Sequence, residues 1–334
     1  MFLIFQSGQN IVGEINDRVN ENNIKLFDVK HPIKHGRIVD WDCMEELWSE
    51  AFKKLHRSAA GQRVFLTRSP IATLADSERM VDIMLEKFQC DGVFIASQGL
   101  MTVFTEDVSG IALCSGAGFS FALPVSDGKA VYNACQHVDI GGNELTRYLK
   151  EMLRMRGYKE FINNTNAVNL IKENNCFVAK NFEEEMALAY TSGTCELTYN
   201  VENGDIVIDR ERFRCPELLF YPVQGWPSPQ LHQLVVDSIA ACPPAIQTKL
   251  YGNIVVSGGN TLFPGAIERL ETEIRAIAPA STVVKVIAGE KRKISDWIGG
   301  SITSSLTQFE QYWISRKAYE EKGKSVVRST LECW

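Results

Sequence analysis

Helix-like and strand-like segments alternate along this chain, and this alternation limits its fold most narrowly. Apolar residues recur with helical periodicity in several stretches, among them 42–55, 76–87 and 142–156. Short apolar runs are typical of buried strands, and they lie at 92–95, 110–113 and 253–256. We therefore expect an α/β architecture in which helices cover the sheets. Because 334 residues exceed what one compact core usually serves, the length predicts two lobes.

Local chemistry predicts where three of the helices begin. Thr165 is placed to cap a helix over 166–174 through its hydroxyl group. Pro264 suits the first turn of a later helix. The acidic run Glu183–Glu185 complements the dipole of a helix in its first turn, so we interpret it as a solvated helix face and not as a metal cluster.

The charge balance argues against several kinds of partner. The 35 Lys and Arg residues stand against 41 Asp and Glu residues, which gives a net charge of -6. No basic run is long enough to neutralise a row of phosphates, so we expect no direct contact with nucleic acid. The apolar start Met1–Phe5 is far shorter than a membrane span and lacks the basic leader of a signal peptide. We expect no membrane association and no secretion.

Neither the cysteines nor the histidines form a metal-binding pattern. The nine cysteines are scattered without a Cys-x-x-Cys pair, which favours free thiols in a reducing compartment. His31 and His35 have the spacing of zinc ligands on a helix, but Pro32 lies between them and favours a turn into a strand. We expect no metal site.

Two glycine turns are the strongest chemical signal in the residues themselves. Cys114–Gly118 joins two predicted strands, and Ser257–Asn260 joins a strand to a helix. Glycine lets the backbone approach a phosphate closely, because no Cβ blocks the path. The chain has no P-loop, no Gly-x-Gly-x-x-Gly after a strand and no Gly-x-Ser-x-Gly elbow. The pair of turns, together with Lys172–Glu173 and Lys293, indicates a nucleotide cleft.

Several longer strings resemble actin and the actin-related proteins. The main ones are ERFRCPELLF at 211–220, SGGNT at 257–261, WIGGSI at 297–302, DIGG at 139–142 and KE at 172–173. They follow the order of the family over nearly the whole chain. The resemblance implies the two-lobed α/β fold that actin shares with heat-shock chaperones and sugar kinases. The actin-like C-terminal third, without an added substrate domain, favours actin over those relatives.

The resemblance also implies a division of the chain. Residues 1–105 plus 295–334 correspond to the first lobe, which contains subdomain 1 of the family. Residues 106–140 plus 228–294 correspond to subdomain 3, and 141–227 to subdomain 4. The family's N-terminal hairpin, with its Asp-x-Gly-Ser/Thr-Gly phosphate loop, and most of subdomain 2 have no counterpart in the string. The first lobe is therefore expected to be incomplete.

By the same resemblance, ATP or ADP lies between the lobes. Gly116 and Gly118 approach the phosphates, and Gln98 matches the glutamine that orients the attacking water. The residues that hold the adenosine are expected to be Lys172, Glu173, Gly258, Gly259, Leu262, Phe263 and Lys293.

Departures from the family pattern point to a weakened site. Cys114 and Ala117 stand where the family has the two aspartates that organise magnesium and its water. Phe121 replaces a histidine close to the hydrolytic water. We therefore expect weak binding of ATP or ADP, doubtful magnesium binding and no efficient ATP hydrolysis.

The resemblance predicts a partner-binding groove as well. An apolar groove is a ready site for a partner protein, and its lining is expected to be Phe104, Ile298, Ile302, Leu306 and Tyr312. The alternative is that these side chains close the core at the lobe boundary. Polar and proline-rich residues at 224–229 replace the family's apolar plug, so polymerisation in the manner of actin is not expected.

Together these features predict an actin-related structural or scaffolding subunit with weak or lost ATP binding. Its partners would be other proteins, such as actin or an actin-related multi-subunit complex, in the cytoplasm and cytoskeleton or in the nucleus. The alternative is an actin-like protein that binds and hydrolyses ATP and polymerises into filaments. The acidic residues of the phosphate loops separate the two hypotheses, and their loss favours the first.

Overall fold

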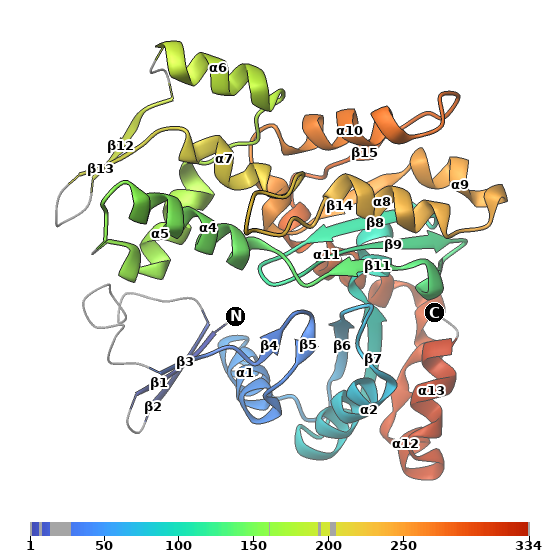
Figure 1. Ribbon diagram of the computed structural model, residues 1–334. Helices are drawn as coiled ribbons and strands as arrows, with labels where there is room; N and C mark the ends of the chain where they lie inside the picture. The colour runs from blue at the N-terminus through green and yellow to red at the C-terminus, as the bar shows by residue number, and fades with distance from the viewer. Residues whose placement is uncertain are drawn as a thin grey trace. The chain divides into compact units, whose positions relative to one another are not determined.

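A computed structural model describes residues 2–6, 9–13, 28–159, 161–192, 195–200 and 205–332 of the chain (Figure 1). Its contacts divide the chain into two compact units. The first unit comprises Met1–Met101 and Trp297–Trp334, and the second comprises Thr102–Asp296. The finer division into subdomains stays a prediction. Residues 14–27, where the sequence predicts at most remnants of subdomain 2, and Cys333 lie outside the described residues.

The first unit is built on a three-stranded sheet of order β16-β7-β6, in which β6 and β7 run parallel and β16 antiparallel. The three strands of this sheet are β6 (Arg63–Arg68), β7 (Gly92–Ser97) and β16 (Ile314–Ser315). The unit has a second three-stranded sheet of β1 (Phe2–Gln6), β2 (Gln9–Gly13) and β3 (Asp28–Lys30), and a two-stranded pair of β4 (Ile33–Lys34) and β5 (Arg37–Ile38). Its helices are α1 (Trp41–Lys54), α2 (Leu74–Asp82), the π-helical turn η2 (Ile83–Lys87), the 3-10 helix η7 (Thr307–Tyr312), α12 (Arg316–Lys322) and α13 (Ser325–Glu332). Helices α3 (Gln98–Val103) and α11 (Ser295–Ser305) contain the boundaries between the units.

The second unit is built on a mixed sheet of order β10-β9-β8-β14-β15, with β11 paired to β9. Its strands are β8 (Gly110–Ser115), β9 (Ser120–Ser126), β10 (Lys129–Ala130), β11 (Gln136–Val138), β14 (Ile254–Ser257) and β15 (Val286–Ile287), and β12 (Leu197–Tyr199) pairs separately with β13 (Ile206–Ile208). Its α-helices are α4 (Gly142–Met155), α5 (Thr165–Asn175), α6 (Phe182–Ser192), α7 (Glu211–Glu217), α8 (Leu231–Ala240), α9 (Pro244–Tyr251) and α10 (Ala266–Ile277). The 3-10 helices are η3 (Tyr132–Ala134), η4 (Phe161–Asn163), η5 (Gly259–Leu262) and η6 (Arg292–Ile294).

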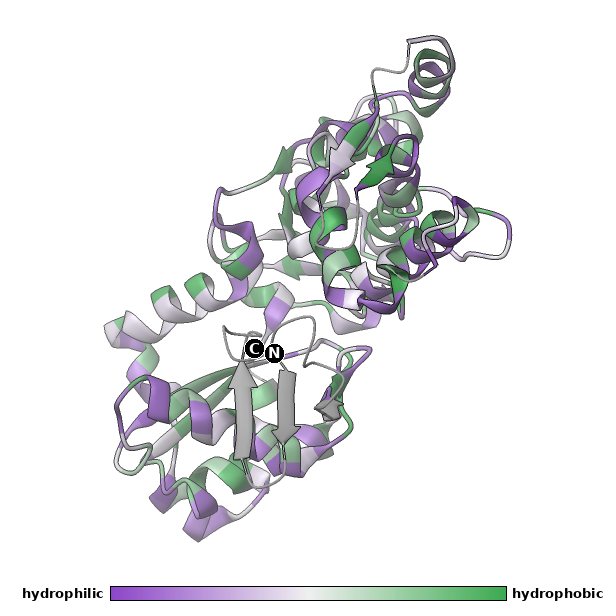
Figure 2. Ribbon diagram, turned by 90° about the vertical axis from the view of Figure 1, so that its left-hand side faces the viewer, coloured by the Kyte–Doolittle hydropathy of each residue, from purple (hydrophilic) through white to green (hydrophobic). Residues whose placement is uncertain are grey.

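Amphipathic helices cover the sheets, as the periodicity predicts. Helix α8 packs on β8 and β9, and α10 packs on α8. Hydrophilic and hydrophobic segments alternate along the helices (Figure 2), whereas β7 and β8 are buried along their whole length. Because both faces of these central strands are covered, they appear in the sequence as continuous apolar runs.

The helix starts differ in detail from the sequence prediction. Asn164, not Thr165, caps α5, and its Oδ1 accepts a hydrogen bond from the backbone N–H of Ala167 at 3.0 Å. Thr165 is the first helical residue, and its hydroxyl accepts from Lys150 Nζ at 2.6 Å. Helix α10 begins at Ala266, two residues after Pro264. The predicted starts are therefore wrong by one and two residues. At α5 the neighbouring Asn164 is an equally good cap, and at α10 the left-handed Gly265, φ 83°, stands between Pro264 and the helix.

The cysteines and histidines of the described residues were the candidates for a metal site. The eight cysteines that the structure describes are free thiols, as predicted. His35 lies with φ 47° in the turn between β4 and β5, so the predicted turn is confirmed. Among the described residues no cluster of His, Cys, Asp and Glu has the arrangement of a metal site. No helix in the described part of the chain is long and apolar enough to cross a membrane.

A buried ion pair joins α7 and α10 inside the second unit. Arg269 is 6% exposed, and its guanidinium contacts Glu217 Oε1 at 2.8 Å and Glu273 Oε1 at 2.6 Å. It also donates to the carbonyl of Ala179 at 2.9 Å and lies 5.3 Å from the centre of the Phe220 ring. Burial raises the pKa of the Glu217 carboxyl even beside this arginine. Both charges are shielded from water, so each depends on the other for its stabilisation.

We expect Arg269→Leu to lower the free energy of unfolding by about 3 kcal/mol, because it leaves a buried carboxylate without its partner. The measurement is urea unfolding followed by circular dichroism. Arg275→Leu on the same helix is the matched control, since Arg275 pairs with Glu271 at the surface and exposed pairs contribute about 1 kcal/mol or less. Equal losses in the two variants would contradict the importance of the buried pair.

Candidate functional site

The two predicted glycine turns lie side by side at one end of the sheet of the second unit. Strands β8 and β14 run parallel, and Ser257, the last residue of β14, pairs with Cys114, the last but one of β8. The turns 116–119 and 258–263 therefore leave the sheet at the same end, the carboxyl end of these two strands. In open α/β sheets, ligands bind outside the carboxyl ends of parallel strands. The carboxyl end of β8 and β14, with its two turns, is the candidate functional site.

The first turn is closed onto the start of α4. The carbonyl of Gly116 accepts the N–H of Gly142 at 3.0 Å, and the carbonyl of Ala117 accepts the N–H of Asn143 at 2.7 Å. The N–H of Gly141 donates to Glu144 Oε2 at 2.9 Å. Free N–H groups at a helix start commonly bind phosphate. Here three of these donors are already satisfied by the protein itself.

The second turn fits tightly against the end of β8. Gly258 has φ +95°, and a Cβ at this position would lie 2.2 Å from the carbonyl oxygen of Ser115. Its N–H donates to the carbonyl of Arg292 at 3.1 Å, which ties the turn to η6. Gly259 differs, because a Cβ there would meet nothing within 4 Å. Only the first of the two glycines is therefore required by packing.

Asn260 joins the two turns. Its Nδ2 donates to Ser115 Oγ at 3.0 Å and to the carbonyl of Gly116 at 2.8 Å. The side chain is 5% exposed. Asn260 belongs to the second predicted turn but is not among the predicted site residues. The sequence feature that could have identified it is an asparagine directly after two glycines at the end of an apolar strand.

Lys172 is an internal part of this site. It is 5% exposed, and burial lowers the pKa of its ammonium group. The ammonium donates to the carbonyl of Gly142 at 3.0 Å, to Thr146 Oγ1 at 2.9 Å and to Asn169 Oδ1 at 2.7 Å. All three of its hydrogens thus have acceptors within the second unit. Its predicted contact with an adenosine stays a prediction.

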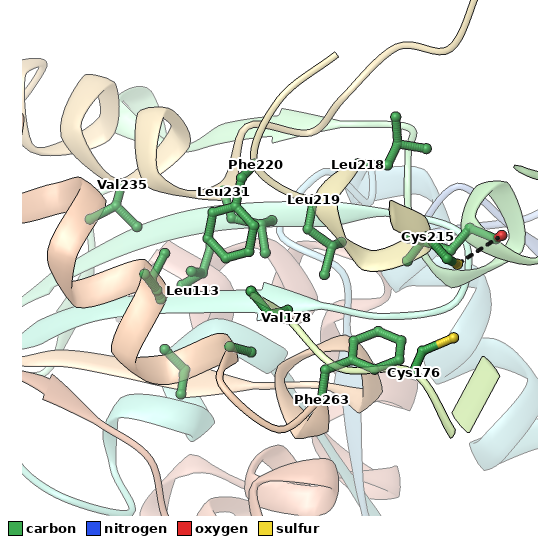
Figure 3. Packing of buried hydrophobic residues seen from close by; sticks show 14 of the residues in the cluster. Leu113, Cys176, Val178, Cys215, Leu218, Leu219, Phe220, Leu231, Val235 and Phe263 are labelled. Carbon is green, nitrogen blue, oxygen red and sulfur yellow. Dashed lines mark hydrogen bonds between the residues drawn. The ribbon is translucent and has the colours of Figure 1, made fainter. Parts of the chain in front are cut away.

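The other predicted adenosine residues differ in their exposure. Glu173 is exposed and accepts from Asn169 Nδ2 at 2.7 Å. Leu262 is 39% exposed, whereas Phe263 is 6% exposed and belongs to the hydrophobic core of the unit (Figure 3). Lys293 is exposed in η6. Three of these residues are therefore accessible to solvent, namely Glu173, Leu262 and Lys293. Phe263 instead packs in the core and anchors the second turn to it.

Neutral groups occupy the positions where the resemblance predicts that an aspartate and a histidine are lost. Cys114 is buried, and its Sγ accepts from Ser257 Oγ at 3.0 Å, with Thr102 Oγ1 at 3.7 Å. Burial raises the pKa of the Cys114 thiol to about 12, so the thiol is protonated at neutral pH. Phe121 is 2% exposed and packs 5.0 Å from the Phe119 ring. A neutral thiol and an aromatic ring do not fit the oxygen-ligand preference of magnesium.

The remaining predicted residues do not all belong to this unit. Gln98 begins α3 at the carboxyl end of β7, in the first unit. Four of the predicted groove residues belong to the first unit, and Phe104 belongs to the second. Ile302 and Leu306 are 46% and 52% exposed. The roles of Gln98 and of the groove stay predictions.

Glycine turns at the carboxyl ends of parallel strands stand where α/β proteins of open-sheet type commonly bind ligands. The family model for actin matches residues 6–332, which is nearly the whole chain. The chain therefore belongs to the actin family. Its mixed α/β structure agrees with an actin-like fold, so the family and the fold class predicted from the sequence are both confirmed.

The two neighbouring glycines make a matched pair for a test. We expect Gly258→Ala to lower the free energy of unfolding by about 2 kcal/mol or more, because it combines an unfavourable φ with a collision. Gly259→Ala is expected to change it by about 0.5 kcal/mol or less. Urea unfolding of both variants measures the difference. A Gly258→Ala variant as stable as Gly259→Ala would refute the tight contact with Ser115.

Proposed function

We propose that this member of the actin family is a structural or scaffolding subunit that binds partner proteins and has weak or lost ATP binding. Its partners would be other proteins, such as actin or an actin-related multi-subunit complex. We place it in the cytoplasm and cytoskeleton or in the nucleus. Nucleotide hydrolysis would not be its main activity.

The observation that carries this proposal is the neutral thiol of Cys114. Magnesium is held in proteins by oxygen ligands, mostly carboxylates. The Cys114 position offers a protonated thiol with hydroxyl neighbours, and Ala117 adds no ligand. Without an anchored cation, the charge on the phosphates of ATP lacks its usual counterion, so both binding and hydrolysis lose a large electrostatic contribution.

The closed state of the turns supports the same proposal. The N–H groups at the start of α4 donate to carbonyls of the first turn, and Asn260 holds that turn to β8. A phosphate that entered here would have to displace hydrogen bonds that are already made. The internal bonds also support a stable second unit without a nucleotide, which suits a subunit with a structural role.

The alternative, an ATP-hydrolysing protein that polymerises, has one feature in its favour. Gly259 is exposed and has open space around its Cα, so its backbone is accessible to a ligand. Leu262 and Lys293 are also exposed. These residues leave room for the base or sugar of a nucleotide, although they supply no magnesium ligand.

The test is the thermal unfolding of the full chain with and without millimolar Mg-ATP. We expect no rise in the unfolding midpoint, since a ligand at one hundred times its dissociation constant would add about 2.7 kcal/mol and be readily seen. Gly259→Asp is the control for site specificity, because its side chain would occupy the space predicted for the adenosine and its Cα faces open space, so the fold can accept it. A rise that EDTA and Gly259→Asp both abolish would overturn the proposal and favour the ATPase.

A further inference from the structure

A second site lies in the first unit, where α1 ends near the end of the π-helical turn η2. A pocket of about 570 Å³ opens there. Three cationic residues, Lys53, Arg57 and Lys87, line it together with His56, Phe52 and Phe88, and no acidic residue is among its lining residues. We call it the basic pocket. A lining of one sign is unexpected on a chain whose net charge is -6.

Backbone hydrogen bonds form the pocket before any ligand is present. The N–H of Gly61 donates to the carbonyl of Gln89 at 3.1 Å, and the N–H of Asp91 donates to the carbonyl of Gln62 at 2.9 Å. These bonds fasten the segment after α1 to the segment after η2. The backbone of the folded unit therefore fixes the shape of the pocket.

Unusual backbone conformations border the same pocket. His56 and Gln89 have φ values of 51° and 55°, a region that residues other than glycine seldom occupy. The turn Ile83–Lys87 is π-helical, and it delivers Lys87 and Phe88 to the pocket wall. Strained residues and π-helical turns are both enriched at functional sites. Three such features border this one pocket.

The cations of the pocket are available to an external anion. Lys53 pairs with Glu50 at 3.2 Å, and Lys87 contacts both oxygens of Glu45 at 2.6 and 2.7 Å. The two lysine side chains are nevertheless 71% and 61% exposed, so each ammonium group is open to solvent on its other side. Arg57 has no ion-pair partner among the described residues. Its guanidinium can bind a carboxylate with two hydrogen bonds.

The aromatic residues add an apolar part to the pocket. The Phe52 and Phe88 rings pack with their centres 5.6 Å apart and are partly buried. An apolar side chain of a ligand can cover them, while carboxylates on either side reach the basic residues. A small inorganic anion would leave this apolar surface unused, and a regular row of phosphates would find too few cations.

We propose that the basic pocket binds an acidic segment of a partner protein, with carboxylates on Arg57, Lys53 and Lys87 and an apolar side chain on Phe52 and Phe88. The proposal names the chemistry of one partner, and in that respect it rests on the proposed scaffolding function. It does not depend on the state of the glycine turns in the other unit.

The test is fluorescence anisotropy of the labelled peptide EEEFEEE with the full chain. We expect saturable binding that weakens as salt is raised, because exposed charges carry it. Arg57→Glu and Lys87→Glu should each weaken binding by about tenfold or more, since each reverses a charge that faces the peptide. Lys249→Glu is the matched control, because it makes the same charge change at an exposed position of α9 in the other unit, and it should bind as the native chain does.

Other outcomes would overturn the proposal. They are equal loss of binding in Lys249→Glu, equal binding of the peptide KKKFKKK, and full displacement of EEEFEEE by an equal concentration of inorganic phosphate. Circular dichroism checks the fold, and Arg57→Gln, which only removes the charge, provides a second variant if Arg57→Glu does not fold. The Mg-ATP experiment is read separately. Peptide binding together with an ATP-dependent rise in the unfolding midpoint would overturn the scaffolding function alone, and absence of both would overturn the basic pocket alone.

Discussion

The parallel pairing of β8 with β14 is the constraint on which the candidate site depends. The two strands are more than one hundred residues apart in the sequence, and their pairing brings their carboxyl ends together, with Cys114 opposite Ser257. Gly258 then passes so close to Ser115 that no side chain fits. Because the two turns touch, one amide, that of Asn260, can hold both. The start of α4 completes the arrangement by donating to the carbonyls of the first turn.

The chemistry of this end of the sheet is largely self-contained. Lys172, Asn260 and the N–H groups of α4 find their acceptors within the unit, and Cys114 is a neutral thiol among hydroxyl groups. A site that satisfies its own polar groups gains less from a charged ligand, because each new contact replaces an existing one. The outer surface offers a contrast. In the first unit, the basic pocket presents cations whose side chains are exposed to solvent.

Local patterns predicted much of the fold. Helix α1, the hairpin of β8 and β9, and the strand β14 follow from residues close in sequence, because periodicity, glycine turns and apolar runs act over a few residues. Errors arise where two local signals compete. Asn164 and Thr165 are both good caps, and the structure uses Asn164. The regular helix predicted over 76–87 changes to a π-helical turn after Asp82, which periodicity alone does not reveal.

The sequence by itself determined the α/β class, the actin family and the absence of a carboxylate at position 114, because these follow from residue types and their order. Only the tertiary structure decided that Lys172 bonds internally, that Phe263 belongs to the core, and that residues 53–57 meet 87–89 in one basic pocket. Each of these depends on contacts between segments distant in sequence. Such contacts are fixed by the packing of whole elements, so no local pattern records them.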